Sequence, residues 1–220
     1  MVIIKKDKDL SSIIDICNKE LVNKSIELFY EFNRIKYPLC DVNCAGTILE
    51  NCIFNTLKQK LKSLKKNKKQ SSPDFWNNSF EYEIKTFIKS PSFDISNFQS
   101  LINQLSEENG VYKKLFNTKF LIFEYSIKDN IVKIKKFWCL NIWNLFNYQG
   151  KYPLSLQCKK GIWYNLRPST STKWSDKDKT WKLFIENIYK CIEICPNIII
   201  NKEEKINSIL KQYIKLKNTF

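Results

Sequence analysis

Residues 72–87 read Ser72-Pro73-Asp74-Phe75-Trp76-Asn77-Asn78-Ser79-Phe80-Glu81-Tyr82-Glu83-Ile84-Lys85-Thr86-Phe87. From Phe80 to Lys85, apolar residues alternate with charged ones, and a period of two indicates a half-buried strand. Side chains two positions apart on a strand point to the same side, so Glu83 and Lys85 share one face. A turn at Asn-Asn-Ser would place Asp74 on the partner strand, beside Glu83. Two carboxylates and one ammonium are therefore expected to converge.

This cluster suits Mg²⁺-dependent cleavage of a phosphodiester. Mg²⁺ prefers oxygen ligands, keeps several waters and takes one or two carboxylates together with phosphate oxygens of the substrate. The metal polarises the phosphoryl group and lowers the pKa of a bound water. A lysine beside it can neutralise the charge that builds up in the transition state. The alternative is a hairpin whose polar face is merely solvated.

The pattern resembles the active-site motif of the PD-(D/E)xK nuclease superfamily, and within it the chain looks like a Type II restriction endonuclease. The resemblance covers about residues 41–126. It implies one or two Mg²⁺ ions per active site. It assigns catalytic roles to Asp74, Glu83, Lys85 and Glu50, and places the metal at Asp74, Glu83 and Ile84. Glu50 is included among the catalytic residues because members of the superfamily often carry an acid on the helix before the hairpin. The alternative is that Glu50 is an ordinary surface glutamate.

Composition narrows the chemistry. The 220 residues carry a formal charge of +15, with 37 Lys and Arg against 22 Asp and Glu. Such an excess favours a polyanionic partner such as double-stranded DNA through counterion release. The sequence contains no histidine, which excludes Ser-His-Asp hydrolysis and nucleases that rely on histidine. A basic nuclease without histidine is left mostly with carboxylate and metal chemistry.

The eight cysteines and the N-terminus bear on location. No signal peptide is recognised, and no apolar run approaches the ~18 residues of a membrane span. We therefore expect a cytoplasmic, bacterial protein with reduced thiols and no membrane contact. A zinc site is the alternative use of the spaced pairs Cys40/Cys44 and Cys191/Cys195, although the more usual Cys-x-x-Cys spacing is missing.

The order of elements supports an α/β fold with a restriction-endonuclease-like core, in which a central mixed β-sheet is flanked by helices. Asp9 or Ser11 is expected to cap a first helix that Pro38 closes, and Asp41 to start a second helix reaching Leu64. The C-terminal half of that second helix is rich in lysine, which fits either the helix dipole or phosphate contacts. After the hairpin, a helix capped by Asp94 or Ser96 leads to a strand at 119–127. This crossover predicts a parallel strand pair.

The remainder is predicted as an additional strand and helix part. We expect an alternating strand at 131–138 with its lysines outward, a short helix at 141–146, and strands near 154–158 and 162–166. A helix from Ser175 or Asp176 to Ile194 and another over 202–216 complete the chain. The whole is read as a single nuclease domain, 1–220. Its catalytic core spans about 41–127, and its DNA-recognition and C-terminal helical part about 131–220.

Residues 163–174 form the segment predicted to read DNA. Arg167 can bind guanine O6 and N7 bidentately, and Asn165 can do the same for adenine N6 and N7. The hydroxyls and the ammonium that follow can contact phosphates and position the protein. They belong to Ser169, Thr170, Thr172 and Lys173. The alternative is an ordinary strand end with Arg167 in a structural ion pair.

The leading hypothesis is a homodimeric Type II restriction endonuclease that cuts both strands of a short palindromic site, since two-fold protein symmetry matches a palindrome. One alternative is a repair or recombination nuclease of the same fold, such as a mismatch nickase or a junction resolvase. Another is a non-catalytic DNA-binding module.

Overall fold

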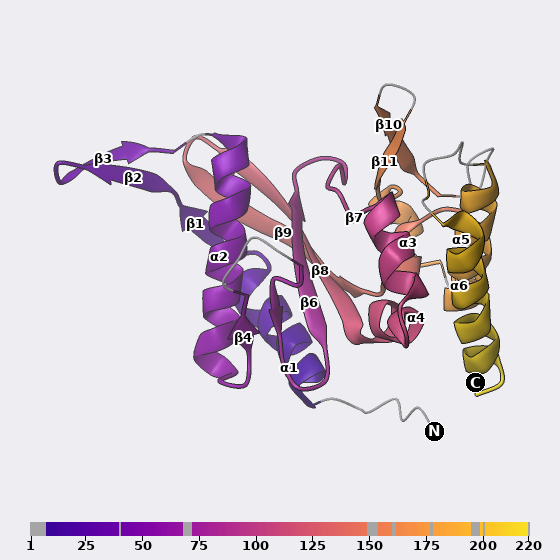
Figure 1. The fold of residues 1–220 in the computed structure, drawn as a ribbon. Coiled ribbons are helices and arrows are strands. Elements are labelled where there is room, and N and C mark those ends of the chain that lie inside the picture. The colour runs from indigo at the N-terminus through magenta and orange to yellow at the C-terminus, as the bar shows by residue number, and fades with distance from the viewer. Residues whose placement is uncertain are drawn as a thin grey trace. The chain divides into compact units, whose positions relative to one another are not determined.

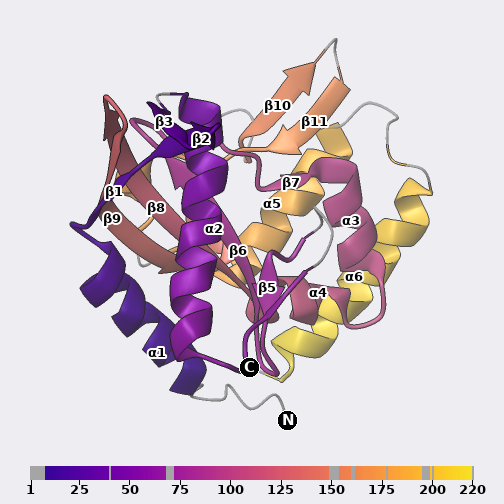
Figure 2. The same cartoon turned by 90° about the vertical axis from the view of Figure 1, so that its left-hand side faces the viewer.

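The computed structural model describes residues 8–39, 41–67, 72–148, 154–159, 162–176, 178–194, 199 and 201–219. The described residues form two compact units (Figures 1 and 2). One unit consists of residues 8–91 and 119–140, and the other of residues 92–118 and 141–219. The first contains the hairpin at 72–87. The expectation that the whole chain is one nuclease domain stays a prediction.

The first unit is built on a six-stranded sheet with the strand order β1-β9-β8-β6-β5-β4. In chain order its strands are β1 (Ser25–Glu27), β4 (Lys65–Lys66), β5 (Phe75–Trp76), β6 (Glu81–Phe87), β8 (Thr118–Lys128) and β9 (Ile131–Leu140). The predicted hairpin is confirmed, because β5 pairs with β6 in antiparallel register, with Phe75 opposite Tyr82. The strand predicted at 119–127 is also confirmed and lies next to β6. The mixed α/β architecture flanked by helices therefore follows the prediction.

Strands β8 and β9 form the longest ladder of this sheet. They pair from Phe120 opposite Leu140 to Lys128 opposite Ile131, with an irregularity between Glu124 and Tyr125. The expected alternation holds at the start of β9, where Val132 and Ile134 are buried while the lysines between and after them are exposed. Period-two patterning is local information, which is why the sequence is enough to predict this pair.

Helix α2 (Val42–Lys60) lies across the sheet and shares its core (Figure 2). Asp41 caps it as predicted, since its Oδ1 accepts a hydrogen bond of 2.8 Å from the Cys44 amide. The apolar side of the helix enters the same buried cluster as Phe75, Tyr82 and Ile84 of the hairpin; the helix contributes Ala45, Leu49, Ile53, Phe54 and Leu57. The stripe was expected to stay helical to Leu64, but the helix ends at Lys60, and Leu64 is buried from the following turn.

The prediction of one long first helix is wrong. Helix α1 spans Lys8–Ile16 and continues into the π-helical turn η1 (Cys17–Leu21). Val22 is then extended, and Asn23 adopts a left-handed conformation with φ of 64°. The chain continues as β1, β2 (Phe29–Phe32) and β3 (Ile35–Pro38). The Asn23 amide binds the Ile134 carbonyl at 2.8 Å, so pairing with the distant strand β9 overrides the local helical pattern.

The second unit combines helices with a three-stranded sheet of order β10-β11-β7. Its elements are β7 (Ser96–Asn97), α3 (Phe98–Ser106), α4 (Gly110–Tyr112), η2 (Lys113–Asn117), η3 (Ile142–Leu145), β10 (Leu156–Lys159), β11 (Ile162–Leu166), η4 (Ser171–Lys173), α5 (Trp181–Ile194) and α6 (Lys202–Lys217). The short helix at 141–146, the two strands and the final helix match the prediction. No helix in the described part of the chain is long and apolar enough to cross a membrane.

Two predicted helix starts in this unit are corrected. Helix α3 is capped by Asn97, whose Oδ1 accepts from the Ser100 amide at 3.0 Å, because Ser96 is taken into strand β7 opposite Leu166. Helix α5 begins at Trp181 and not at Ser175 or Asp176. The Thr180 hydroxyl oxygen accepts from the Leu183 amide at 3.2 Å and so occupies the capping position.

Candidate active site

Asp74 is held at the start of the hairpin by backbone bonds on both sides. Its amide donates to the Tyr82 carbonyl at 3.0 Å, and its own carbonyl accepts from the Asn67 amide at 3.1 Å. Its carboxylate Oδ2 accepts from the Ile84 amide at 2.6 Å. The acid therefore reaches across the ladder to β6, as the sequence predicted. Ile84 takes part through its backbone, while its side chain lies in the core.

Glu83 and Lys85 project from the same face of β6. The Glu83 side chain is 6% exposed and that of Lys85 is 24% exposed, and Lys85 Nζ lies 3.8 Å from Glu83 Oε2. The other oxygen, Oε1, accepts a hydrogen bond from the Ser72 hydroxyl. A buried carboxylate needs such partners, because removal from water disfavours its charged form. Ser72 was not predicted as a site residue.

Glu50 reaches this cluster from α2. Burial is the main cause that raises the pKa of Glu50 to about 7, the negative charges of Asp74 and Glu83 add to it, and the positive charge of Lys85 opposes it. A carboxylate at the surface feels no comparable field from three other site residues. Glu50 is therefore close enough to the two hairpin acids and Lys85 to interact with their charges, and its catalytic role stays a prediction.

Tyr125 of β8 lies behind Glu50 and was not predicted. The Tyr125 side chain is 3% exposed. Burial is the main cause that raises its pKa, and the nearby charge of Glu50 also contributes. Gly46, one helical turn before Glu50, allows α2 to come close to the sheet: a Cβ at this position would lie 3.3 Å from Thr86 Oγ1 and 3.8 Å from the Tyr125 hydroxyl oxygen. A Cβ at Gly46 would make a tight contact with the Thr86 side chain, which would have to shift to admit it.

The fit of a divalent cation was tested on this donor set. Within residues 8–67 and 72–219, as far as the structure describes them, no three acidic or cysteine side chains stand in an arrangement that would hold a metal ion. Several carboxylate oxygens are instead satisfied by protein donors, namely the Ile84 amide, the Ser72 hydroxyl and the Lys85 ammonium. The chemistry nevertheless fits, because all the donors are oxygens. Burial, together with the nearby carboxylates, favours the protonated form of Glu50, and a cation would displace that proton.

Arg167, the predicted base reader, makes three contacts inside its own unit. Its Nε lies 3.0 Å from Asp94 Oδ1, and its two terminal nitrogens donate to the Ser92 carbonyl and, at 3.3 Å, to Gln157 Oε1. These contacts tie the segment before α3 to strands β10 and β11. This is the structural ion pair that the sequence left open as the alternative.

The other residues predicted to contact DNA differ in how far their side chains are exposed to solvent. Asn165 is 8% exposed within β11, so its side chain is buried among neighbouring strands. Ser169 donates its hydroxyl to the Leu145 carbonyl at 3.0 Å and thereby fixes the turn that follows. Thr170, Thr172 and Lys173 are exposed. The turn is also held by the buried Lys179, which donates to the carbonyls of Lys173 and, at 3.3 Å, Asn144.

In the described part of the chain, three of the lysines that follow the middle of α2 make local structural contacts. Lys58 donates to the Lys62 carbonyl at 2.8 Å beyond the helix end, which is the contact expected at a helix C-terminus. Lys60 pairs with Glu20 at 2.5 Å, and Lys66 lies 5.1 Å from the centre of the Phe54 ring. The structural interpretation of these lysines is therefore favoured over phosphate contact.

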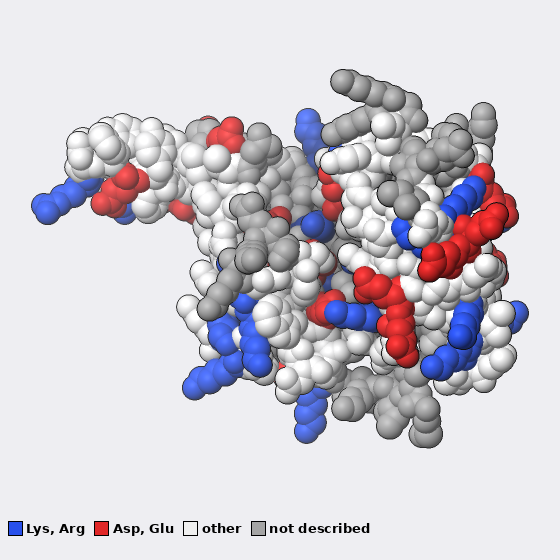
Figure 3. Space-filling model, in the orientation of Figure 1, with Lys and Arg blue, Asp and Glu red and all other residues white. Residues whose placement is uncertain are grey.

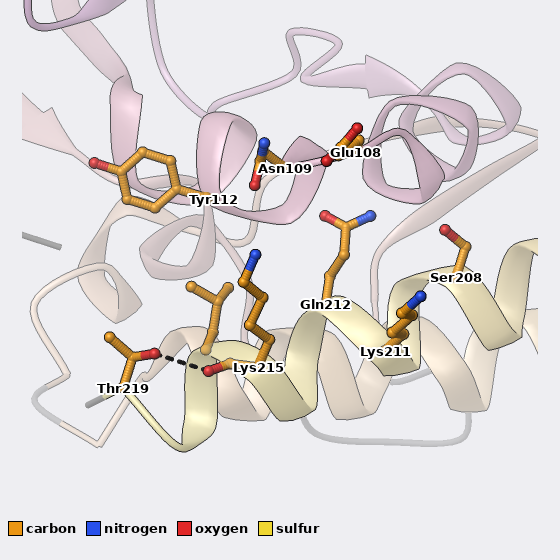
Figure 4. A pocket seen from close by; sticks show the side chains of 9 residues that line it. Glu108, Asn109, Tyr112, Ser208, Lys211, Gln212, Lys215 and Thr219 are labelled. Atoms are coloured by element: carbon orange, nitrogen blue, oxygen red, sulfur yellow. Dashed lines mark hydrogen bonds between the residues drawn. The ribbon is translucent and has the colours of Figure 1, made fainter. Parts of the chain in front are cut away.

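Two further features lie away from the acid cluster. Cys40 and Cys195 of the zinc alternative lie outside the described residues, while Cys44 is exposed and Cys191 is buried. A cavity of about 950 Å³ lies between α6 and the segment around α4 in the second unit (Figure 4). Lys211 and Lys215 line it together with Tyr112 and Gln212, and it contains none of the predicted site residues.

Comparisons with known proteins were made on both sequence and structure. The family model described as NgoBV restriction endonuclease matches residues 16–219. The chain is 28% identical over 133 residues to a Type II restriction enzyme, NlaIV, of Neisseria lactamica; the match covers 56% of this chain and spans about half (53%) of the length of that curated relative. A solved structure of NlaIV restriction endonuclease is similar with a TM-score of 0.78 at 21% identity, covering 94% of this chain and 89% of that one.

Proposed function

Because the chain belongs to the NgoBV restriction endonuclease family, we propose that it is a Type II restriction endonuclease. It would hydrolyse phosphodiester bonds of double-stranded DNA at a short, palindromic site. The observation that carries the proposal is the convergence of Asp74, Glu83, Lys85 and Glu50 from a hairpin and a helix that are distant in sequence. Charged side chains without a shared role are not expected to converge on one small, half-buried face.

The two hairpin acids are assigned to the metal. Asp74 and Glu83 would hold one or two Mg²⁺ ions, with the backbone of Ile84 beside them. When bound, Mg²⁺ supplies a polarised phosphoryl group and a water of lowered pKa. Asp74 is already oriented toward the site by the Ile84 amide, and Glu83 can exchange its Ser72 and Lys85 partners for a cation. Preorganised ligands of this kind reduce the reorganisation needed at the moment of reaction.

Lys85 and Glu50 are assigned to charge and proton control. The Lys85 ammonium, on the same strand face as Glu83, would stabilise negative charge that develops on the phosphoryl oxygens. Glu50, with a pKa of about 7, can exchange a proton near neutral pH.

Recognition is assigned to the segment from β11 to η4. Thr170, Thr172 and Lys173 are exposed and suit phosphate contact. Arg167 would have to exchange Asp94 for guanine in order to read a base. The buried Asn165 would need a larger rearrangement, and Ser169 serves to position the turn. Because a palindrome is read symmetrically, we expect the protein to act as a homodimer in the bacterial cytoplasm.

The test is digestion of DNA of known sequence with Mg²⁺, followed by mapping of the ends. Discrete fragments with a common sequence at every end are expected. A structure-selective nuclease would leave plain duplex intact and cut mismatched or branched DNA instead. Binding of duplex with no cleavage under any divalent metal would identify a binding module. The matched control is Glu83→Gln, which keeps the size of the side chain but removes its charge.

A further inference from the structure

Strands β2 and β3 form a two-stranded hairpin, residues 29–38, which we call the arm. It extends beyond β1 and α2 of its own unit (Figure 1). The turn at its tip is made by Asn33 and Arg34, with φ of 51° and 64°. Positive φ at both central residues is typical of the tight turn whose twist matches antiparallel strands. The arm is therefore a well-formed hairpin, although a hairpin alone is only marginally stable in water.

The two faces of the arm differ in chemistry. Residues opposite each other on antiparallel strands share a face. One face pairs Glu31 with Lys36, and the Lys36 ammonium also lies 4.2 Å from the centre of the Phe29 ring. This face has charged groups and can remain in water.

The other face is apolar throughout and is defined by two pairs, Tyr30 with Tyr37 and Phe32 with Ile35. The two tyrosine rings stack with centroids 5.0 Å apart. Tyr30 is 53% exposed, Phe32 64% and Ile35 56%. Four large side chains on one face of a two-stranded sheet, three of them more than half exposed and Tyr37 partly exposed, mark a surface that binds a partner.

The absence of charged side chains on this apolar face indicates which kind of partner it can bind. DNA affinity comes mainly from Lys and Arg contacts to phosphates, and the apolar face of the arm has no charged side chain. Two copies of a chain with a charge of +15 repel each other. Contact between copies is therefore least costly on a face that carries no charge. Figure 3 shows the arm, at the left, as mostly uncharged surface with its charged side chains gathered on one side.

We propose that the face formed by Tyr30, Phe32, Ile35 and Tyr37 binds the same face of a second copy, in a two-fold contact. The proposal rests on the proposed function, since a palindrome cut on both strands calls for two copies. An aromatic side chain buries about 150–250 Å² in full, so the three partly exposed aromatic side chains and Ile35 supply roughly 350 Å² per copy. That is about half of the ~800 Å² per partner in a standard interface. The arm is accordingly the anchor of the contact and not its whole extent.

The test replaces the pair at the end of the arm. The double variant Phe32→Thr with Ile35→Thr places β-branched threonine, which favours a strand, at both positions while removing the apolar surface. The matched control is Ile131→Thr, since Ile131 is 47% exposed on β9 of the same unit. Each full-length protein is examined by sedimentation velocity without DNA across a concentration series, and by circular dichroism and thermal melting. We expect twice 26.3 kDa for the natural chain and the control, and a dimer dissociation constant at least tenfold higher for the double variant.

The outcomes separate this proposal from the proposed function. A natural chain that is monomeric at all concentrations, or a folded double variant that dimerises as well as the control, overturns the arm contact. A double variant with unchanged mass but weaker DNA binding overturns it in favour of a DNA contact. Dimerisation that depends on the arm in a protein that cleaves no DNA supports the contact and refutes the nuclease. Double-strand cleavage by a double variant that still dimerises as the natural chain does supports the nuclease and refutes the arm contact.

Discussion

Replacing Glu50 by glutamine should make the protein more stable at alkaline pH and should leave its stability nearly unchanged in acid. Glu50 has a pKa of about 7 in the folded protein, whereas an exposed glutamate has a pKa of about 4.3. As pH rises through this interval, the unfolded chain loses its proton first, so the folded state loses stability. This loss of folding stability is small below about pH 4.3 and complete above about pH 7.

The size of the effect follows from that interval. Each pKa unit corresponds to about 1.36 kcal/mol, so the full difference is about 3.7 kcal/mol for a completely buried group. Glu50 is only partly buried, and solvent screening reduces the effect to about 1.5–2 kcal/mol. Glutamine has no proton to lose and escapes the penalty. The gap in stability between Glu50→Gln and the natural protein should therefore open between about pH 5 and pH 7.

The assay is urea unfolding of both proteins at several pH values from 5 to 8, with Asp15→Asn as control. Asp15 is an exposed carboxylate of α1 in the same unit. Addition of Mg²⁺ should narrow the gap, since a bound cation favours the charged carboxylate. A gap that stays constant within about 0.5 kcal/mol across this range, at the resolution expected of such measurements, would show that neither burial nor the neighbouring carboxylates raise the pKa of Glu50 in the folded protein.

Four further outcomes are expected. Asp74→Asn and Glu83→Gln should each lower cleavage at least a hundredfold and leave DNA binding, measured by fluorescence anisotropy, within a fewfold; activity within tenfold of the natural protein would place the metal elsewhere. Ca²⁺ in place of Mg²⁺ should support binding without turnover, and efficient cutting in Ca²⁺ or in EDTA would contradict metal-ligand roles for the two acids. Lys85→Gln should abolish cleavage while costing only about 1 kcal/mol of stability, because Lys85 Nζ is 3.8 Å from a carboxylate that also has another donor; a much larger fall in melting temperature would point to a structural role. Arg167→Ala should destabilise the fold by about 1–2 kcal/mol and Asp94→Ala by less, because both break the ion pair but only Arg167→Ala also removes the hydrogen bonds to Ser92 and Gln157; if Arg167 also reads a base, only Arg167→Ala should narrow the gap between specific and random duplex affinity, at nearly unchanged salt dependence.

The sequence by itself determined the elements whose pattern is local. The alternation around Tyr82 and Glu83 specified a strand and its two faces, and Asn-Asn-Ser specified the turn that brings Asp74 back to it. The same information predicted β8 and β9, because a period of two along one strand needs no knowledge of its neighbour. The absence of histidine limited the chemistry in the same direct way.

Tertiary structure alone decided the features that depend on partners far along the chain. The segment after Leu21 has a helical spacing of apolar residues, but it pairs with β9, more than 100 residues later, and becomes a strand. Glu50 is an ordinary helical glutamate in sequence. Its pKa is raised mainly because α2 buries it against the sheet, and the negative charges of Asp74 and Glu83 add to the effect. Likewise, Arg167 finds Asp94 and Ser92 about 75 residues earlier in the chain. Burial and Coulomb interaction depend on distance in space, which no local pattern specifies.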